Sequence, residues 1–88
     1  MDEQHLLECY RRIWHNRRLD SRLPPEEALE DALMRDLLDE GTHPRVRKSI
    51  TDKYALSVSR VQDSLLQKEE KNELIIRYNT VMNRLLNH

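Results

Sequence analysis

Two side chains near the start of the chain, His5 and Cys9, could share a metal ion, because residues four apart lie on one face of a helix. Imidazole nitrogen and thiolate sulfur both bind zinc, but a zinc site usually takes three or four protein ligands. The other histidines, His15, His43 and His88, have no spacing that supplies them. We therefore predict no metal and no cofactor, and expect Cys9 to be a small buried residue.

Catalytic side chains are not predicted either. Asp and Glu number 16 among 88 residues, but they fall at positions typical of solvated helix faces. The sequence shows no set of Ser, His and Asp and no glycine-rich phosphate loop. We therefore expect a protein that is not an enzyme.

The segment of residues 50–65, ITDKYALSVSRVQDSL, has the pattern of two short helices joined by a tight turn. Ser57 stands where the second helix would begin, since a Ser hydroxyl can accept hydrogen bonds from free backbone N–H groups. The apolar positions that would fix the angle between the helices are Ile50, Tyr54, Leu56, Val61 and Leu65.

This segment resembles the helix-turn-helix superfamily of transcriptional regulators, although Ala55 replaces the usual turn glycine and Thr51 the usual small residue. The resemblance implies that the second helix lies in the major groove of DNA and contacts base edges. Its implied base-contacting residues are Val58, Ser59, Arg60, Gln62 and Asp63, with Arg60 suited to guanine and Gln62 to adenine, and Ser57 at its start is also predicted to bind DNA. Arg45, Arg47, Lys48 and Lys53 would contact phosphates. The alternative is a packing corner that binds no nucleic acid.

A second apolar stripe lies near the C-terminus, after the polar stretch of residues 67–73, QKEEKNE. It could pack on its own helical core, or it could form a dimerisation or partner-binding helix within residues 68–88. The residues of this predicted interface are Leu74, Ile75, Tyr78, Val81, Met82 and Leu85.

The composition favours helices throughout, since Leu, Glu, Arg and Lys are abundant and there is one glycine. We predict an all-α fold in one domain, residues 1–88, with a helix-turn-helix-like corner and a long C-terminal helix. Helices are expected over about 3–19, 24–40 and 44–54, and from Ser57 for about 30 residues, with Gly41 ending the second.

Charge, cysteine content and hydropathy limit the cellular locations that are expected for the protein. The net charge is −1, yet residues 43–67 carry five basic and two acidic side chains. A single cysteine excludes an intrachain disulfide framework, and no apolar run could span a membrane. The N-terminus lacks a signal-peptide pattern, so a cytoplasmic or nucleoid-associated protein is expected.

The leading prediction is a small, non-enzymatic, dimeric regulator that binds double-stranded DNA. The alternative is a helical adaptor or inhibitor that binds a partner protein and no nucleic acid. A thin core with few aromatic residues favours a homodimer or another permanent partner.

Overall fold

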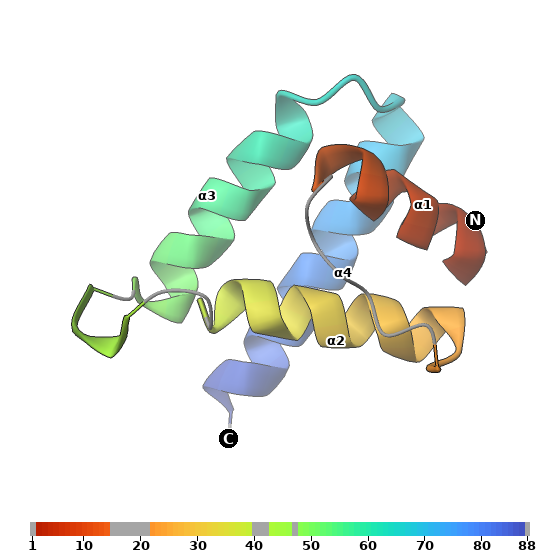
Figure 1. Ribbon diagram of the computed structural model, residues 1–88. Coiled ribbons are helices and arrows are strands. Elements are labelled where there is room, and N and C mark those ends of the chain that lie inside the picture. The colour runs from red at the N-terminus through yellow and green to blue at the C-terminus, as the bar shows by residue number, and fades with distance from the viewer. Residues whose placement is uncertain (1, 15–21, 40–42, 47, 88) are drawn as a thin grey trace.

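The computed structural model of the protein describes residues 2–14, 22–39, 43–46 and 48–87. The described residues form four α-helices and one short 3₁₀ helix, with no strand among them. These elements are α1 (Glu3–Ile13), α2 (Pro25–Leu37), η1 (Pro44–Val46), α3 (Ile50–Gln62) and α4 (Lys68–Leu86) (Figure 1). The prediction of an all-α bundle is confirmed. None of the helices in the described ranges has both the length and the apolar character needed to cross a membrane.

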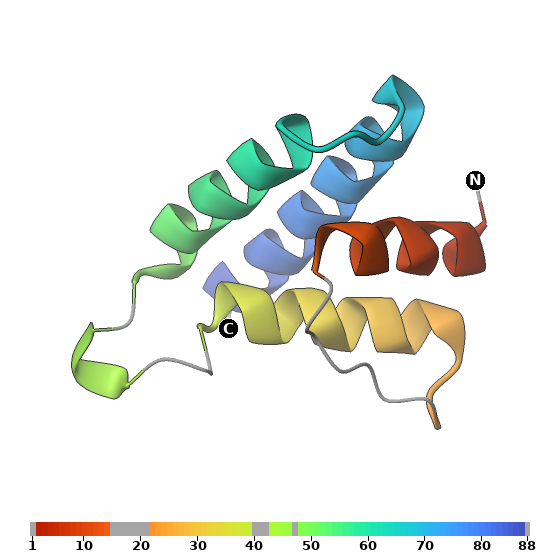
Figure 2. The same ribbon diagram turned by 45° about the horizontal axis from the view of Figure 1, so that its top comes forward.

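The helices form two layers. The helices α3 and α4 run antiparallel, joined by the short loop of residues 63–67, while α1 and α2 lie side by side and point the same way (Figure 2). The helix α4 contacts all three other α-helices. Side chains on α4 can therefore meet side chains from each of the other α-helices.

The core is built from apolar side chains of all four α-helices. Leu6, Leu29, Leu33 and Leu74 are almost completely buried and lie on three different helices. Full burial of such a side chain contributes about 1.5–3 kcal/mol to stability. Cys9 is also buried, as expected.

The first two helices end earlier than the sequence predicts. Trp14 lies outside α1 with a non-helical backbone (φ −117°, ψ 74°), and residues 15–19 lie outside the described residues. The helix α2 ends at Leu37, and Asp39 takes the left-handed conformation (φ 55°) that we assigned to Gly41. Asp tolerates this conformation better than most residues other than glycine. Gly41 itself lies outside the described residues.

The predicted turn between two short helices at residues 54–57 is wrong. The helix α3 runs without interruption through Ala55 and Leu56, and begins after Ser49, whose hydroxyl accepts a hydrogen bond from Asp52 N–H at 3.2 Å. Ala and Leu are strong helix formers, so this segment has no local reason to break. Upstream, the predicted helix over 44–54 is replaced by η1 and the start of α3.

The predicted 30-residue C-terminal helix is divided in two by the loop of residues 63–67. Ser64 stabilises the turn by donating its hydroxyl to Val61 O at 2.6 Å. A reciprocal capping box then starts α4: the Gln67 side chain accepts from the Glu70 N–H, and the Glu70 carboxylate accepts from the Gln67 N–H. The polar stretch is therefore the first turn of α4, not a gap in one long helix.

The C-terminal apolar stripe packs against the chain's own core. Leu74, Tyr78 and Val81 are buried, and Ile75, Met82 and Leu85 pack partly against them. This outcome agrees with the first of the two alternatives for the stripe. The buried members of the predicted interface are therefore not on the surface of the single chain.

Candidate functional site

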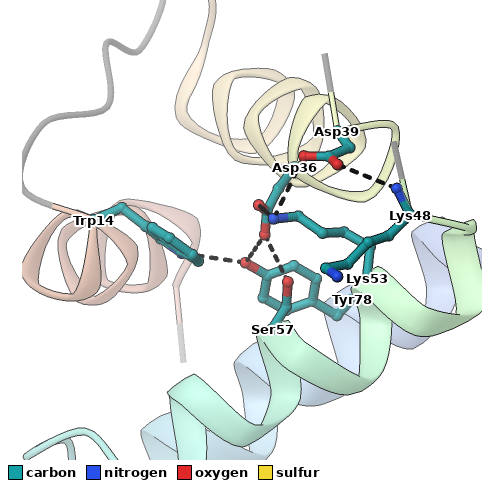
Figure 3. A network of polar contacts seen from close by, with 7 residues as sticks. All are labelled: Trp14, Asp36, Asp39, Lys48, Lys53, Ser57 and Tyr78. Carbon is teal, nitrogen blue, oxygen red and sulfur yellow. Dashed lines mark hydrogen bonds and ion pairs between the residues drawn. The ribbon is translucent and has the colours of Figure 1, made fainter. Parts of the chain in front are cut away.

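The most buried polar group of the described residues is the carboxylate of Asp36, on α2. Its Oδ2 atom accepts one hydrogen bond from the Ser57 hydroxyl and one from the Tyr78 hydroxyl, each at 2.8 Å (Figure 3). Trp14 in turn donates its indole N–H to the Tyr78 hydroxyl at 3.3 Å. This network joins residues at the end of α1 and on α2, α3 and α4.

Lys53 balances the charge of the Asp36 network. Its Nζ atom lies 3.6 Å from Asp36 Oδ1 and 3.7 Å from Asp39 Oδ1, and its side chain is only 17% exposed. The backbone N–H of Lys48 donates to the other Asp39 oxygen at 3.3 Å. A buried carboxylate needs such partners because an unpaired buried charge is strongly destabilising.

The Asp36 network is closed to ligands. Asp36 and Tyr78 have no exposed surface, and Ser57 is almost fully buried. Burial and the neighbouring Asp36 charge strongly raise the pKa of the Tyr78 hydroxyl, which stays protonated and donates. The arrangement fixes the relative positions of the helices, and its inaccessible groups do not form a site for substrate.

A second polar cluster joins His5 and Cys9 on α1 to Glu70 on α4. Glu70 Oε2 lies 2.6 Å from His5 Nε2 and accepts the Cys9 thiol hydrogen bond at a distance of 3.2 Å from Sγ. The spacing of four residues brings His5 and Cys9 to one face of α1, and the capping box holds Glu70. Cys9 and Glu70 are buried, whereas the His5 side chain is 44% exposed. This cluster therefore reaches solvent.

Hydrogen bonds control the ionisation of the cluster. The Gln67 N–H, the Cys9 thiol and His5 together lower the pKa of Glu70 to about 2. Burial and the neighbouring Glu70 carboxylate raise the pKa of Cys9 to about 11. At neutral pH the cluster thus contains an ionised carboxylate and a protonated thiol.

The sequence analysis identified two members of this cluster and missed Glu70. The three ligand atoms, one each from imidazole, thiol and carboxylate, all lie within 4.8 Å of one another. These are the donor types that bind transition metals. The sequence does contain a pattern that places Glu70 in the first turn of a helix, since Gln67 and Glu70 have the spacing of a capping box.

The residues predicted to contact DNA do not form one surface. Ser57 and Lys53 belong to the Asp36 network, and Arg47 lies outside the described residues. Arg60 is exposed, with its guanidinium carbon 4.2 Å from the centre of the Trp14 ring. Val58 is half-buried on α3, and the remaining predicted contacts are exposed: Arg45 in η1, Lys48 shortly after it, Ser59 and Gln62 on α3, and Asp63 directly after α3.

The exposed face of α3 is not basic. Arg60 shares it with two acidic residues, Asp52 and Asp63, and with the uncharged Leu56 and Ser59. Acidic side chains repel phosphates, so this face lacks the concentrated positive charge typical of DNA-binding helices.

Comparisons with known proteins identify relatives of the chain. The profile of the YoyC family matches residues 1–88 of this chain. The protein named "Uncharacterized protein YoyC" from Bacillus subtilis (strain 168) is 32% identical over 74 residues, which cover 84% of this chain and 78% of the relative. No solved structure matches the chain. The chain therefore belongs to the YoyC family.

Proposed function

We propose that this protein is a non-enzymatic helical module that binds a partner protein. The proposed contact is a groove between the end of α1 and the α3–α4 loop, with a volume of about 510 Å³. The observation that carries the proposal is Leu65, which lines this groove and is fully exposed, more than any other large apolar residue in the part of the chain that the structure describes.

The lining of the groove indicates the chemistry of the partner. Ile13 and Leu66 supply apolar surface beside Leu65, and both pack with the core, so the floor is fixed before a partner arrives. Arg12 and Arg60 lie at its rim against one acid, Asp63. Apolar anchors flanked by positive charge suit an amphipathic helix with apolar residues on one face and acidic residues beside them.

A second groove, between α2 and α4, suits a partner less well. It has a volume of about 300 Å³, and Arg84 at its edge forms an ion pair with Glu30. Arg77, also at its edge, forms an ion pair with Glu3. A partner would have to replace these pairs, whereas an apolar anchor beside Leu65 covers surface that is already exposed to water.

The test is selection of helical peptides from a displayed random library on the immobilised protein. We expect enriched peptides to combine apolar residues at three- and four-residue spacing with Asp and Glu. Fluorescence anisotropy would then measure one such peptide against wild type, Leu65→Asp, and Leu86→Asp as the control. Leu86 is 51% exposed, near the other end of α4.

We expect Leu65→Asp to weaken peptide binding by at least tenfold and Leu86→Asp to leave it unchanged, because loss of one anchor costs more than about 1.4 kcal/mol. Equal binding to the Leu65→Asp variant, or no enriched pattern, would contradict the proposal.

Double-stranded DNA is the ligand that the sequence predicts first, and it stays a prediction. Anisotropy with a random-sequence duplex between 50 and 200 mM salt tests it directly. Affinity that falls steeply with salt, and falls further in Arg60→Ala, would favour DNA over the peptide groove.

A further inference from the structure

We propose that His5, Cys9 and Glu70 bind one Zn²⁺ ion that links α1 to α4. The three ligand atoms already lie within 4.8 Å of one another, although they come from positions up to 65 residues apart. A fourth position would face solvent on the side of the exposed His5 ring and take a water molecule. This site is independent of the proposed peptide groove, whose lining contains none of the three ligands.

The donor set favours zinc over other common ions. Thiolate is a poor ligand for Mg²⁺ and Ca²⁺, which bind oxygen atoms. Carboxylate is a poor partner for Cu⁺, which prefers sulfur. Zinc accepts imidazole nitrogen, thiolate sulfur and carboxylate oxygen in one tetrahedral site, and it often keeps water beside three protein ligands.

Small movements would convert the hydrogen-bonded cluster into a metal site. Around a tetrahedral zinc ion, nitrogen and oxygen ligands lie about 3.3 Å apart, and sulfur and oxygen about 3.6 Å apart. The corresponding distances here are 2.6 Å from His5 Nε2 to Glu70 Oε2 and 3.2 Å from Cys9 Sγ to that same oxygen. The exposed His5 ring can turn to lengthen the first distance, and a small rotation of the Cys9 side chain lengthens the second.

A hydrogen bond from Gln67 orients the Glu70 carboxylate for metal binding. Its Oε1 atom accepts the Gln67 N–H at 2.9 Å, so the capping box fixes the carboxylate and leaves Oε2 for the cluster. Metal ligands that are held by such outer hydrogen bonds bind more tightly. On binding, the thiol proton of Cys9 leaves to solvent and zinc takes its place on sulfur, so that no oxidant or reductant is needed.

The first experiment is titration of the full chain, without an affinity tag, with Co²⁺ and then with Zn²⁺. We expect one Co²⁺ per chain, with a thiolate-to-cobalt charge-transfer band and the intense visible bands of tetrahedral cobalt, and we expect Zn²⁺ to displace it. The variants are His5→Gln, Cys9→Ala and Glu70→Gln. His43→Gln is the matched control, because His43 is exposed and outside the cluster.

Each cluster variant should lose more than the roughly 100-fold in affinity that removal of an outer-shell partner can cost, and the control should bind as wild type does. Glu70→Gln keeps an oxygen for the Gln67 N–H, and His5→Gln changes an exposed side chain, so at least these two are expected to fold; circular dichroism checks this. At a zinc concentration of 100 times Kd, the Tm of wild type should rise by roughly 10–20 °C. Unchanged affinity in folded His5→Gln or Cys9→Ala, or no charge-transfer band in wild type, would overturn the proposal.

Discussion

Two carboxylates are buried among the described residues, those of Asp36 and Glu70, and their surroundings differ. Asp36 has no exposed surface, accepts two hydroxyl hydrogen bonds and lies near the Lys53 ammonium group. Glu70 accepts one backbone N–H, one thiol and a contact from a half-exposed imidazole. Both carboxylates join helices, but only the second lies beside an imidazole and a sulfur atom that can bind a metal.

The two sets of partners indicate which buried carboxylate contributes only to the stability of the fold. Hydroxyl and ammonium groups satisfy Asp36, and no solvent or ligand can reach it, so its partners have one stable arrangement. The partners of Glu70 include two groups that can give up a proton or take a metal in its place. Stability should therefore depend mainly on Asp36, and ligand chemistry mainly on Glu70.

The largest expected effect on stability comes from replacing Asp36, and its absence would contradict the comparison. We expect Asp36→Ala to lower the free energy of unfolding by about 3–5 kcal/mol, because it leaves two buried hydroxyl groups without their acceptor and removes one of the two carboxylates beside Lys53. Urea denaturation followed by Trp14 fluorescence measures the change. Asp36→Asn keeps an oxygen for the hydroxyl groups and should cost less. A loss below about 1 kcal/mol in Asp36→Ala would show that the Asp36 network contributes little to stability.

A smaller effect is expected from removing one hydroxyl of the same network. Tyr78→Phe deletes the donor to Asp36 and the acceptor for the Trp14 indole N–H, and should destabilise the fold by about 1–3 kcal/mol. Tyr54→Phe is the control, since Tyr54 is half-buried and its hydroxyl is outside the network of Figure 3. Equal stability of the two variants would contradict the assignment.

The smallest of these effects is the loss of stability at low pH that results from protonation of Glu70. Its pKa is about 2 in the folded protein and 4.5 for the ordinary group, so the folded state favours the ionised form. This stabilisation is present above pH 4.5 and is lost as the pH falls towards 2. We expect urea midpoints to decline over that window in wild type. In Glu70→Gln the decline should be shallower, and an identical decline in both proteins would show that other carboxylates cause it.

The sequence predicts part of the core of this fold, because apolar spacing depends on local geometry. The C-terminal stripe of Leu74, Tyr78 and Val81 faces the interior, whereas Leu56 and Leu65, expected to fix the angle between two helices, are exposed. The turn predicted at Ser57 is absent, since a Ser hydroxyl can either cap a helix start or donate to a buried acceptor. Its actual partner is Asp36, 21 residues earlier, and no local pattern reveals such a contact.

The candidate metal cluster shows the same limit. The pair of His5 and Cys9 is visible as a spacing of four on one helix. Its third member depends on the loop of residues 63–67, which turns the chain and sets the first turn of α4 against α1. A prediction that continues the helix through this loop carries Glu70 away from Cys9.

The distance along the chain between α1 and Glu70 also affects how the protein is made. A ribosome adds about 5–20 residues per second, so Glu70 follows His5, 65 positions earlier, by roughly 3–13 s. The hairpin of α3 and α4 closes through a short loop and can form soon after its synthesis. Until α4 has been synthesised, Cys9 has neither the complete core around it nor the Glu70 carboxylate beside it. The newly made thiol is then open to oxidants and metal ions that the finished fold restricts.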